Sequence, residues 1–265
     1  MRLALAITTY ERPDALAAVL ASVSRQSASP AEIIIADDGS GEATRVVIEG
    51  FTRSSFVPVR AVSQPHAGFR VARLRNLAIA ATNAEYVVFV DGDMLLHPEF
   101  IADHVRVARR GYFTQGVRAN ADPALTRRLL DDPSLAVEPT TRGLGGLRRA
   151  YLLHAPALSP LARTIGNALI SIKSCNQGFW RRDLLRVNGF NEAFESWGPE
   201  DKELCARLRH AGVRRQTLLF GGIAVHLHHP PASRDGVAAN VAILETTRKE
   251  RKIRCERGLD AHLRS

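Results

Sequence analysis

Paired carboxylates stand directly after two apolar runs of the sequence. "VFVDGDMLL" carries Asp91 and Asp93, and "IIIADDGSG" carries Asp37 and Asp38. Carboxylates beside a buried strand are costly unless they bind a partner. Hard oxygen ligands of this kind suit Mg²⁺ or Mn²⁺, often together with substrate phosphates. A plain Asp-Gly turn is the alternative for each pair, since Asp and Gly favour turns.

Histidines follow a third apolar run. "GIAVHLHHPP" contains His226 and His229. Taken alone, a histidine in such a place is more often a surface or core residue than a ligand. Together with Asp93 it would complete a metal site, because Mn²⁺ accepts imidazole although it does not prefer it.

The stretch "FESWGPEDKEL" places Glu200 and Asp201 after Trp197 and a Gly-Pro break. One interpretation is an acidic helix start, because carboxylates favour the positive end of a helix. The other is a catalytic carboxylate beside an aromatic platform. The pattern by itself leaves both open.

The elements that must position these residues alternate between strand and helix in the first half. Strands are expected at "LALAIT", "EIIIAD", "PVRAVSQ" and "EYVVFVDGDMLL". Helices are expected at "RPDALAAVLASVSRQ", "GEATRVVIEGF" and "GFRVARLRNLAIAAT". The alternation predicts an α/β fold with a mostly parallel sheet, whose ligands bind at the carboxyl ends of the strands.

The second half is less regular. Residues 116–170 lack a clear period and are interpreted as a variable, acceptor-side insertion. Order resumes with a strand, a turn and a helix that ends at Gly189, in which Phe179 and Trp180 are core residues. A helix capped by Gly212 and a strand ending in histidines follow. A C-terminal helix is expected over 232–265, and its basic stretch "TRKERKIRCERG" is interpreted as a solvated helix.

Composition narrows the class of protein. The chain has 265 residues, 45% of them hydrophobic, enough for one large domain. Its net charge of +9 suggests an anionic partner. Three widely spaced cysteines give no disulfide framework, so a cytoplasmic protein is expected. No signal peptide, membrane span or nucleic-acid-binding signature is recognised.

The ordered set of motifs resembles family 2 glycosyltransferases of the GT-A fold. The matching stretches are "ITTYERP", "IIIADDGS", "ARLRNLAIAAT", "YVVFVDGDM", "GFWRRDLLRVNGFNEAFESWGPED" and "VHLHHP". The later ones also resemble the C-terminal region of β-galactosyltransferases, N-acetylgalactosaminyltransferases and bacterial chondroitin-synthase-like enzymes. The resemblance implies one domain with a nucleotide-sugar half (1–115), the insertion (116–170), an acceptor region (171–231) and the C-terminal helix (232–265).

The resemblance also implies the site residues. The substrate-binding residues would be Thr9, Tyr10, Arg12, Asp38, Arg75, Asn76, Asp91, Asn176, Trp197 and Glu200. Thr9, Tyr10 and Arg12 would contact the nucleotide, and Asp38 would hold the uracil or its ribose.

Further positions take more specific roles. Arg75 and Asn76 would approach the base and diphosphate, and Asp91 the ribose or metal. Asn176 would line the donor-sugar pocket, although a strand-helix turn capped by Asn explains it nearly as well. His66 and Gly68 in "QPHAGF" would form a loop near the nucleotide.

The metal, Mn²⁺ or Mg²⁺, would be ligated by Asp93 and His226, with His229 as the alternative. Asp201 would be the general base, which must reach the acceptor hydroxyl. Glu200 would hydrogen-bond the acceptor and Trp197 would stack on it. Pro199 replaces a second glycine that relatives often have at this place.

The expected function is an inverting, metal-dependent transfer from a UDP-sugar to a saccharide or glycolipid. Galactose-type sugars are favoured, in cell-surface glycan synthesis such as lipopolysaccharide or capsule, with peripheral contact to an anionic inner membrane face. A nucleotidyltransferase is the first alternative, but it would usually carry an early Gly-rich phosphate loop. A non-catalytic binder of sugar nucleotides or polyanions is the second, but it has no use for both acidic motifs.

Overall fold

The computed structural model describes residues 1–160, 171–230 and 236–263. Within these ranges one sheet has seven strands in the order β3-β2-β1-β4-β8-β6-β9. In that order the strands are β3 (Val59–Ser63), β2 (Glu32–Asp37), β1 (Leu3–Thr9), β4 (Tyr86–Asp91), β8 (Asn176–Trp180), β6 (Tyr112–Gln115) and β9 (Arg214–Thr217).

The expected α/β fold with a mostly parallel sheet is confirmed. Strands β1 to β4 pair in parallel, and β6 pairs in parallel with β9. Strand β8 runs antiparallel to both of its neighbours, β4 and β6. The register sets Thr9 opposite Asp37 and Thr8 opposite Asp91. The carboxyl ends of β1, β2 and β4 therefore meet at one edge of the sheet.

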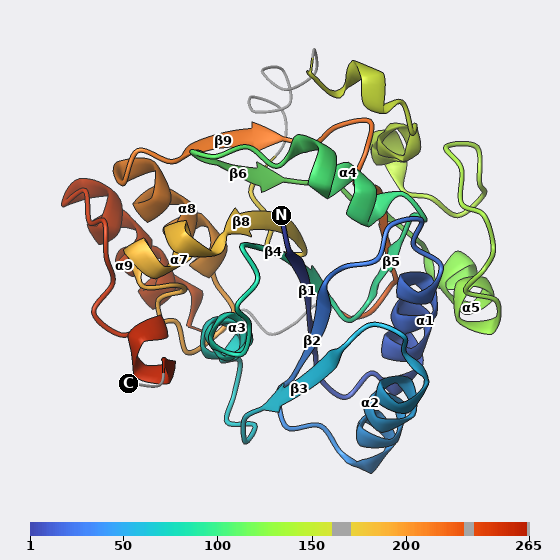
Figure 1. Cartoon of the computed structure of the whole chain (residues 1–265), viewed down its shortest axis with the longest axis horizontal. Coiled ribbons are helices and arrows are strands. Elements are labelled where there is room, and N and C mark those ends of the chain that lie inside the picture. The colour runs from blue at the N-terminus through green and yellow to red at the C-terminus, as the bar shows by residue number, and fades with distance from the viewer. Residues whose placement is uncertain (161–170, 231–235, 264–265) are drawn as a thin grey trace.

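Helices cover both faces of this sheet, as Figure 1 shows. Side chains alternate along each strand, so Leu5 and Ile7 pack with one set of helices and Ala6 with the other. The first set includes α1 (Pro13–Ser24), α2 (Glu42–Ser54) and α4 (Phe100–Val107). The second set includes α3 (Val71–Ala80), α7 (Arg181–Val187) and α8 (Glu200–His210).

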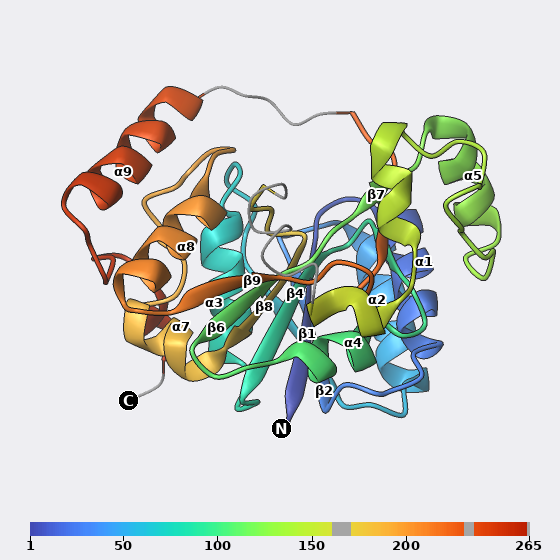
Figure 2. The same cartoon turned by 90° about the horizontal axis from the view of Figure 1, so that it is seen from above.

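A three-stranded sheet adjoins the carboxyl edge. It consists of β5 (Met94–Leu96), β10 (Ala224–His226) and β7 (Ala119–Asn120), in that order. It shares a third apolar cluster with helix α5 (Pro123–Asp131). Figure 2 shows α5 and α9 (Val237–Lys249) on opposite sides of the molecule. Short 3₁₀ helices are η1 (Gly146–Leu152), η2 (Pro156–Leu158) and η3 (Leu259–His262).

Several sequence expectations are confirmed in detail. Pro13 opens α1, and Phe179 and Trp180 are buried in β8. Helix α7 ends before Asn188 and Gly189, which both have positive φ. Part of the strand expected before the turn and that helix lies outside the described residues, and Asn176 itself begins β8 instead of capping a helix.

Two expectations are corrected. The apolar run from residue 86 to 96 is two strands, because the chain turns after Asp91 and β5 joins the small sheet. The basic stretch is not one solvated helix, because α9 ends at Lys249 and Arg251 adopts a φ of 52°. Beyond it Cys255 is buried, so this segment packs on the protein.

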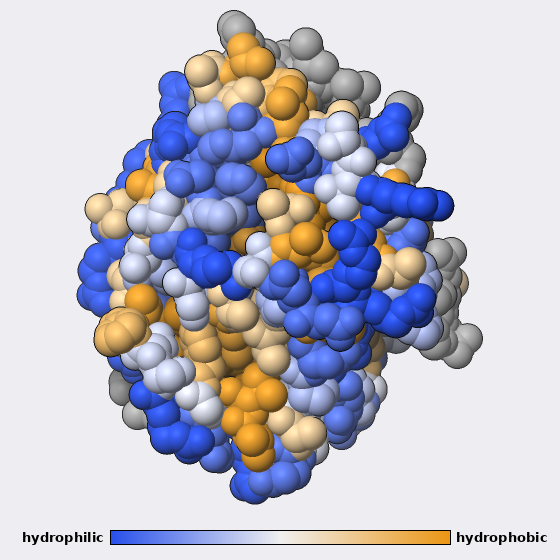
Figure 3. Space-filling model, turned by 90° about the vertical axis from the view of Figure 1, so that its right-hand side faces the viewer, coloured by the Kyte–Doolittle hydropathy of each residue, from blue (hydrophilic) through white to orange (hydrophobic). Residues whose placement is uncertain are grey.

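The face that carries α1, α2 and α5 shows apolar side chains in a broken band between hydrophilic ones (Figure 3). Val46 in α2 is half-exposed, and Phe56, which follows α2, is fully exposed. In the described ranges no helix is long and apolar enough to cross a membrane.

Candidate active site

The carboxyl edge of the sheet holds the first group of predicted residues. Thr8 donates from Oγ1 to Oδ1 of Asp91 over 3.1 Å, which fixes that carboxylate at the end of β4. Thr9, at the end of β1, has a buried Oγ1 for which the described part of the chain supplies no hydrogen-bond partner. Asp37 caps its own turn, since it accepts from both the N–H and the hydroxyl of Ser40. Asp37 therefore shapes the edge, and Asp91 and Thr9 face it.

Asp38 lies beside an aromatic pair. Gln64 donates from Nε2 to one of its carboxylate oxygens over 2.5 Å, and His66 Nδ1 lies 3.0 Å from the other. The His66 ring stacks on Tyr10 with centroids 4.1 Å apart, and Tyr10 is 44% exposed. The structure thus brings Tyr10, Asp38 and the expected His66 loop together, with the aromatic ring of Tyr10 toward solvent.

Three potential metal ligands, Asp93, His226 and His229, come together where the two sheets meet, and we call them the cation cluster. Asp93 lies in the turn between β4 and β5, and the Leu227 N–H donates to its carbonyl over 2.9 Å. His226 Nε2 and His229 Nε2 lie 3.4 Å and 3.2 Å from Oδ2 of Asp93. One ligand atom from each of the three residues fits within 4.8 Å of the others. The structure therefore brings both alternative histidines to the same carboxylate.

The electrostatics of this cluster fit a bound cation. Burial opposes ionisation of Asp93, but the hydrogen bond from His229 and the nearby His226 and Arg118 outweigh it, so its pKa is lowered. Burial lowers the pKa of His226 to about 4, which leaves a neutral imidazole. Oδ1 of Asp93 is buried and has no hydrogen-bond partner among the described residues, so one oxygen is free for a metal.

The donor set is a carboxylate and two imidazoles, with Asp91 close by at the end of β4. Imidazole suits Mn²⁺ better than Mg²⁺, which prefers oxygen ligands and water. His229 differs from His226 in two ways: its hydrogen bond to Asp93 raises its pKa, and its other ring nitrogen contacts the Pro230 carbonyl. The residues present fit a divalent cation, with His226 as the better prepared histidine.

An acid pair stands at the start of α8. Glu200 and Asp201 occupy the first turn of this helix and are 5% and 9% exposed. Arg75 donates to Glu200 Oε1 over 2.8 Å and to Asp91 Oδ1 over 3.3 Å. The Ser174 N–H donates to Asp201 Oδ2 over 3.0 Å. Glu200 and Asp201 therefore do stand at a helix start, as one interpretation expected. Arg75 connects this acid pair to Asp91 at the end of β4.

Burial dominates the ionisation of this pair. It raises the pKa of Glu200 to about 7, with Asp201 adding to the rise and Arg75 opposing it. Burial also raises the pKa of Asp201, again against the pull of Arg75. For Arg75 itself burial lowers the pKa, but Asp91 and Glu200 outweigh it. A carboxylate with a raised pKa is a stronger proton acceptor once ionised.

The loop before α8 is held in place by hydrogen bonds from helix α9. Asn240 in α9 is 3% exposed and donates to the Ser196 carbonyl over 2.9 Å and to the Trp197 carbonyl over 3.3 Å. A side chain on Gly198 would collide with it, since a Cβ there would lie 2.5 Å from Nδ2 of Asn240. Trp197 remains 40% exposed. The loop therefore presents this indole beside the acid pair on a fixed backbone.

Two predicted substrate-binding residues do not join the site. Asn76 has no exposed surface and exchanges hydrogen bonds with the backbone of Phe190. Asn176 is also buried, and its amide donates to the carbonyls of Val117 and Gly222. Their amides are already used by the protein, so the structure gives both a positioning role in place of the expected substrate contact.

Arg12 lies at the rim of the site. It pairs with Asp14 over 3.3 Å and acts electrostatically on His229, so its charge is near the cation cluster. Arg118 is closer still and was not found from the sequence. It follows β6, donates to Cys175 Sγ over 3.3 Å and lowers the pKa of Asp93. Nothing in "TQGVRAN" signals this role, because the residues that Arg118 faces come from other elements.

Comparison with known proteins identifies the class. The sequence model of glycosyl transferase family 2 matches residues 4–155, more than half of the chain. A second model, described as the N-terminal domain of galactosyltransferase, matches residues 169–230. The chain belongs to glycosyl transferase family 2, as its motifs predicted.

Individual relatives agree with this. The chain is 27% identical to validoxylamine A glucosyltransferase of Streptomyces hygroscopicus subsp. limoneus, covering 80% of this chain and 48% of the relative. It is 25% identical to chondroitin synthase of Escherichia coli, covering 86% of this chain and 35% of the relative. The chain thus spans about half or less of the length of these relatives.

Solved structures establish the fold. The crystal structure of S. aureus TarS 1-349 in complex with UDP superposes with a TM-score of 0.62 at 16% identity, covering 87% of this chain and 61% of TarS. The chain therefore has the GT-A fold that its motifs predicted.

Proposed function

We propose that this chain transfers a sugar from a UDP-sugar to a hydroxyl of a saccharide acceptor. The observation that carries the proposal is the connection, through Arg75, of a strand-edge carboxylate to a buried acid pair. The cation cluster stands on one side of this connection, and the acid pair beside an exposed indole stands on the other. Such a site has separate places for a charged leaving group and for an incoming hydroxyl.

The donor nucleotide would bind along the carboxyl edge of β1, β2 and β4, where ligands of open α/β sheets bind. Tyr10 offers an exposed ring and Asp38 a carboxylate at the same corner. Arg12 and Arg118 bring positive charge to the cation cluster, where a diphosphate would lie. A neighbour of the same fold that was solved with UDP supports this choice of nucleotide.

A divalent cation would be held by Asp93 and His226, with His229 or Asp91 completing its ligands. When bound, it supplies positive charge that stabilises the departing diphosphate. His226 is suited to this because its imidazole is neutral, and Asp93 because its carboxylate is ionised and has a free oxygen. The chain's own contribution is to hold these ligands between the two sheets.

Asp201 would act as the general base. Its carboxylate takes the proton of the acceptor hydroxyl, while that oxygen bonds to the anomeric carbon and the bond to the diphosphate oxygen breaks. Because attack comes from the side opposite the leaving UDP, the configuration inverts. Glu200 would hydrogen-bond the acceptor, and Trp197 would give the sugar an apolar face.

The match of residues 169–230 to a galactosyltransferase domain favours a galactose-type donor, and a glucosyltransferase among the relatives keeps glucose as the competitor. The product would be a surface polysaccharide or a lipid-linked glycan, made at the cytoplasmic side of a membrane. The relation to chondroitin synthase supports a polysaccharide as product. The net charge of +9 would favour an anionic membrane surface. Co-sedimentation equal for anionic and neutral liposomes would contradict that contact.

The first experiment is calorimetric titration of UDP into the wild type and Asp93→Asn, each with Mn²⁺ and with a chelator. The wild type should bind UDP with Mn²⁺ and lose most of the affinity with the chelator. Asp93→Asn should bind equally weakly in both conditions, because it has lost the free carboxylate oxygen.

Asp131→Asn is the matched control, since Asp131 is exposed at the end of α5. This variant should bind UDP as the wild type does. A wild type that binds no UDP under either condition would contradict the proposal. A panel of UDP-sugars would then rank galactose, glucose and their N-acetylated forms.

A further inference from the structure

A groove of about 430 Å³ lies at the β9 edge of the large sheet, at the other end of the strand order from β3. It is formed where α8 ends and β9 begins. Its lining residues are Ile172, Arg209, Gly212, Val213, Arg214 and Arg215. Half of these residues are arginines, and the others are glycine, valine and isoleucine.

Two of the three arginines, Arg209 and Arg214, carry positive charge that the described acidic side chains do not pair. Arg214 instead lies over the Tyr112 ring, 4.9 Å from its centroid. Burial lowers the pKa of Arg215, Cys205 opposes this, and Arg209 adds to the lowering, so Arg209 lies near Arg215.

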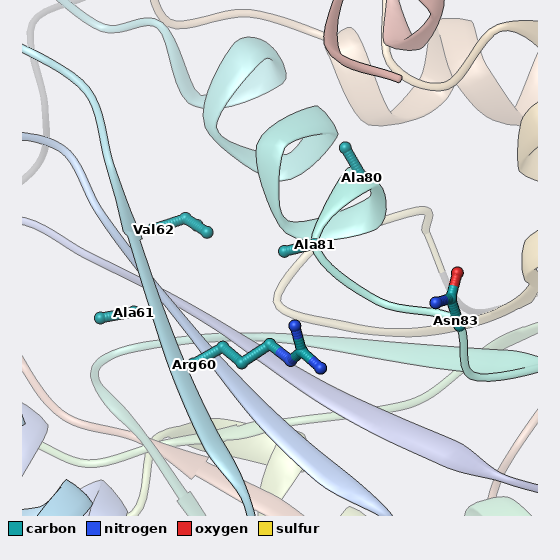
Figure 4. Close-up of a pocket in the computed structure, with 6 residues that line it drawn as sticks. All are labelled: Arg60, Ala61, Val62, Ala80, Ala81 and Asn83. Carbon is teal, nitrogen blue, oxygen red and sulfur yellow. The ribbon is translucent and has the colours of Figure 1, made fainter. Parts of the chain in front are cut away.

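The hollow at the opposite edge of the sheet is different. Figure 4 shows its lining residues, which come from β3 and from the end of α3 and the residues after it. It encloses about 610 Å³, and its one lining cation, Arg60, pairs with Glu32 over 3.4 Å. Its other lining residues are alanine, valine and asparagine. Volume alone therefore does not distinguish this arginine groove. The charge of Arg209 and Arg214, which no described acidic side chain pairs, does distinguish it.

The arginine groove adjoins the acid pair. Ile172 lines it, and two residues later Ser174 donates to the carboxylate of Asp201. Two residues of extended chain span at most about 7 Å. Helix α8 has Asp201 in its first turn and Arg209 in its last, about 12 Å apart at 1.5 Å per residue. The groove and the acid pair are therefore separated by about the length of one or two sugar units.

We propose that the arginine groove binds a carboxylate or phosphate group of the saccharide acceptor. The neighbouring hydroxyl of that acceptor then lies at the acid pair. This inference rests on the proposed transfer reaction, and it narrows the acceptor to an anionic glycan. Arginine suits such a ligand because its planar fork binds carboxylate and phosphate through paired hydrogen bonds.

The test compares Arg209→Gln/Arg214→Gln with the wild type in titrations with three soluble probes. The first is a glucuronate-containing tetrasaccharide, and the second is the same tetrasaccharide with its carboxylates reduced to alcohols. The third is inorganic tripolyphosphate. We expect the wild type to bind an anionic probe about tenfold more tightly than the double variant does, with weaker binding at higher salt.

The matched control is Arg45→Gln/Arg53→Gln, which removes two exposed arginines from α2 at the other end of the sheet. This control should bind the probes as the wild type does. Equal binding of the charged and reduced tetrasaccharides, with no effect on tripolyphosphate binding, would overturn the proposal. Binding only to anionic vesicles, and to no soluble probe, would also overturn it.

UDP titration with Mn²⁺ separates this inference from the proposed function. The groove variants should bind UDP normally, because neither Arg209 nor Arg214 belongs to the cation cluster. If UDP does not bind to the wild type, the transfer reaction fails whatever the groove binds. If UDP binds and the anionic probes do not depend on the arginines, the inference about the acceptor alone fails.

Discussion

The two acidic groups of the site differ in what surrounds them. Asp93 lies between two histidines, which together with Arg118 lower its pKa in spite of its burial. Glu200 and Asp201 are packed at the start of α8, where burial raises the pKa of both in spite of Arg75. The carboxyl group thus has a lowered pKa in the cation cluster and a raised pKa in the acid pair. An ionised carboxylate suits a cation, and one with a raised pKa suits proton transfer.

Arg75 makes these groups parts of one site. It bonds to Asp91 beside the cation cluster and to Glu200 in the acid pair, and it is almost completely buried. A buried cation that contacts both acids reduces the repulsion between them. The comparison therefore predicts two kinds of variant: those that change one acidic group alone, and those that change the connection between them.

Replacement of the base is expected to have the largest effect. Asp201→Asn should lower turnover with a saccharide acceptor by about 10²–10⁴-fold, since this is what a positioned base contributes. It should leave Mn²⁺-dependent UDP binding intact, because the cation cluster does not include Asp201. Steady-state kinetics and calorimetry on the same preparation measure the two effects.

The exposed Glu195, which pairs with Arg257, gives a control in the same segment. Glu195→Gln should keep both turnover and UDP binding. Loss of UDP binding in Asp201→Asn would mean that the two acidic groups do not work separately, and the comparison would fail.

Removal of the connection should affect stability. Arg75→Gln leaves Glu200 and Asp91 without their buried cation, and breaking such a pair costs about 3–5 kcal/mol. Urea denaturation should show this decrease in the free energy of unfolding. Arg73→Gln, on the same helix, loses one hydrogen bond to Gln64 and should cost only about 1 kcal/mol. Equal costs for the two variants would show that the acid pair does not depend on Arg75.

The pH dependence of stability sharpens the contrast. The pKa of Glu200 is about 7 in the folded protein, above the ordinary glutamate value of 4.5. Between these values the folded state holds more protons than the unfolded state. The free energy of unfolding contributed by Glu200 is therefore full below about pH 4.5 and falls as the pH rises toward 7.

The slope reaches at most about 1.4 kcal/mol per pH unit for one such group. Urea denaturation at pH 5, 6 and 7 should show the decline in the wild type. The decline should be smaller in Glu200→Gln, which cannot ionise. Parallel curves for the two proteins would contradict the raised pKa.

Local sequence patterns predicted the residues that close elements bring together. Asp91 and Asp93 follow a β-branched run, and the strand order of an α/β sheet then sets them at the ligand edge. Glu200 and Asp201 follow a Gly-Pro break, so a helix start was readable. Family motifs added the meaning of His226, because a histidine after a strand has no such meaning by itself.

The contacts between distant residues could not be predicted in this way. Arg75 and Glu200 are 125 positions apart, and the sequence around each residue contains no pattern that predicts contact with the other. Asparagine was ambiguous for a different reason, since its amide serves a ligand and a buried backbone equally well. Asn76 and Asn176 were expected at the substrate and instead bind Phe190 and Gly222. Only the packing of α3 and β8 decides between these uses.

Replacement of Asn240 is expected to have the smallest effect, and to affect the loop before the acid pair without affecting the cation cluster. Asn240 joins α9 to the loop before the acid pair through the carbonyls of Ser196 and Trp197. Asn240→Ala removes these bonds, each worth about 1 kcal/mol, so amide exchange over residues 196–200 should become about tenfold faster. UDP binding with Mn²⁺ should not change, and Asn83→Ala, at an exposed position in the loop after α3, should change neither measurement. Unchanged exchange in Asn240→Ala would mean that these hydrogen bonds do not hold the loop.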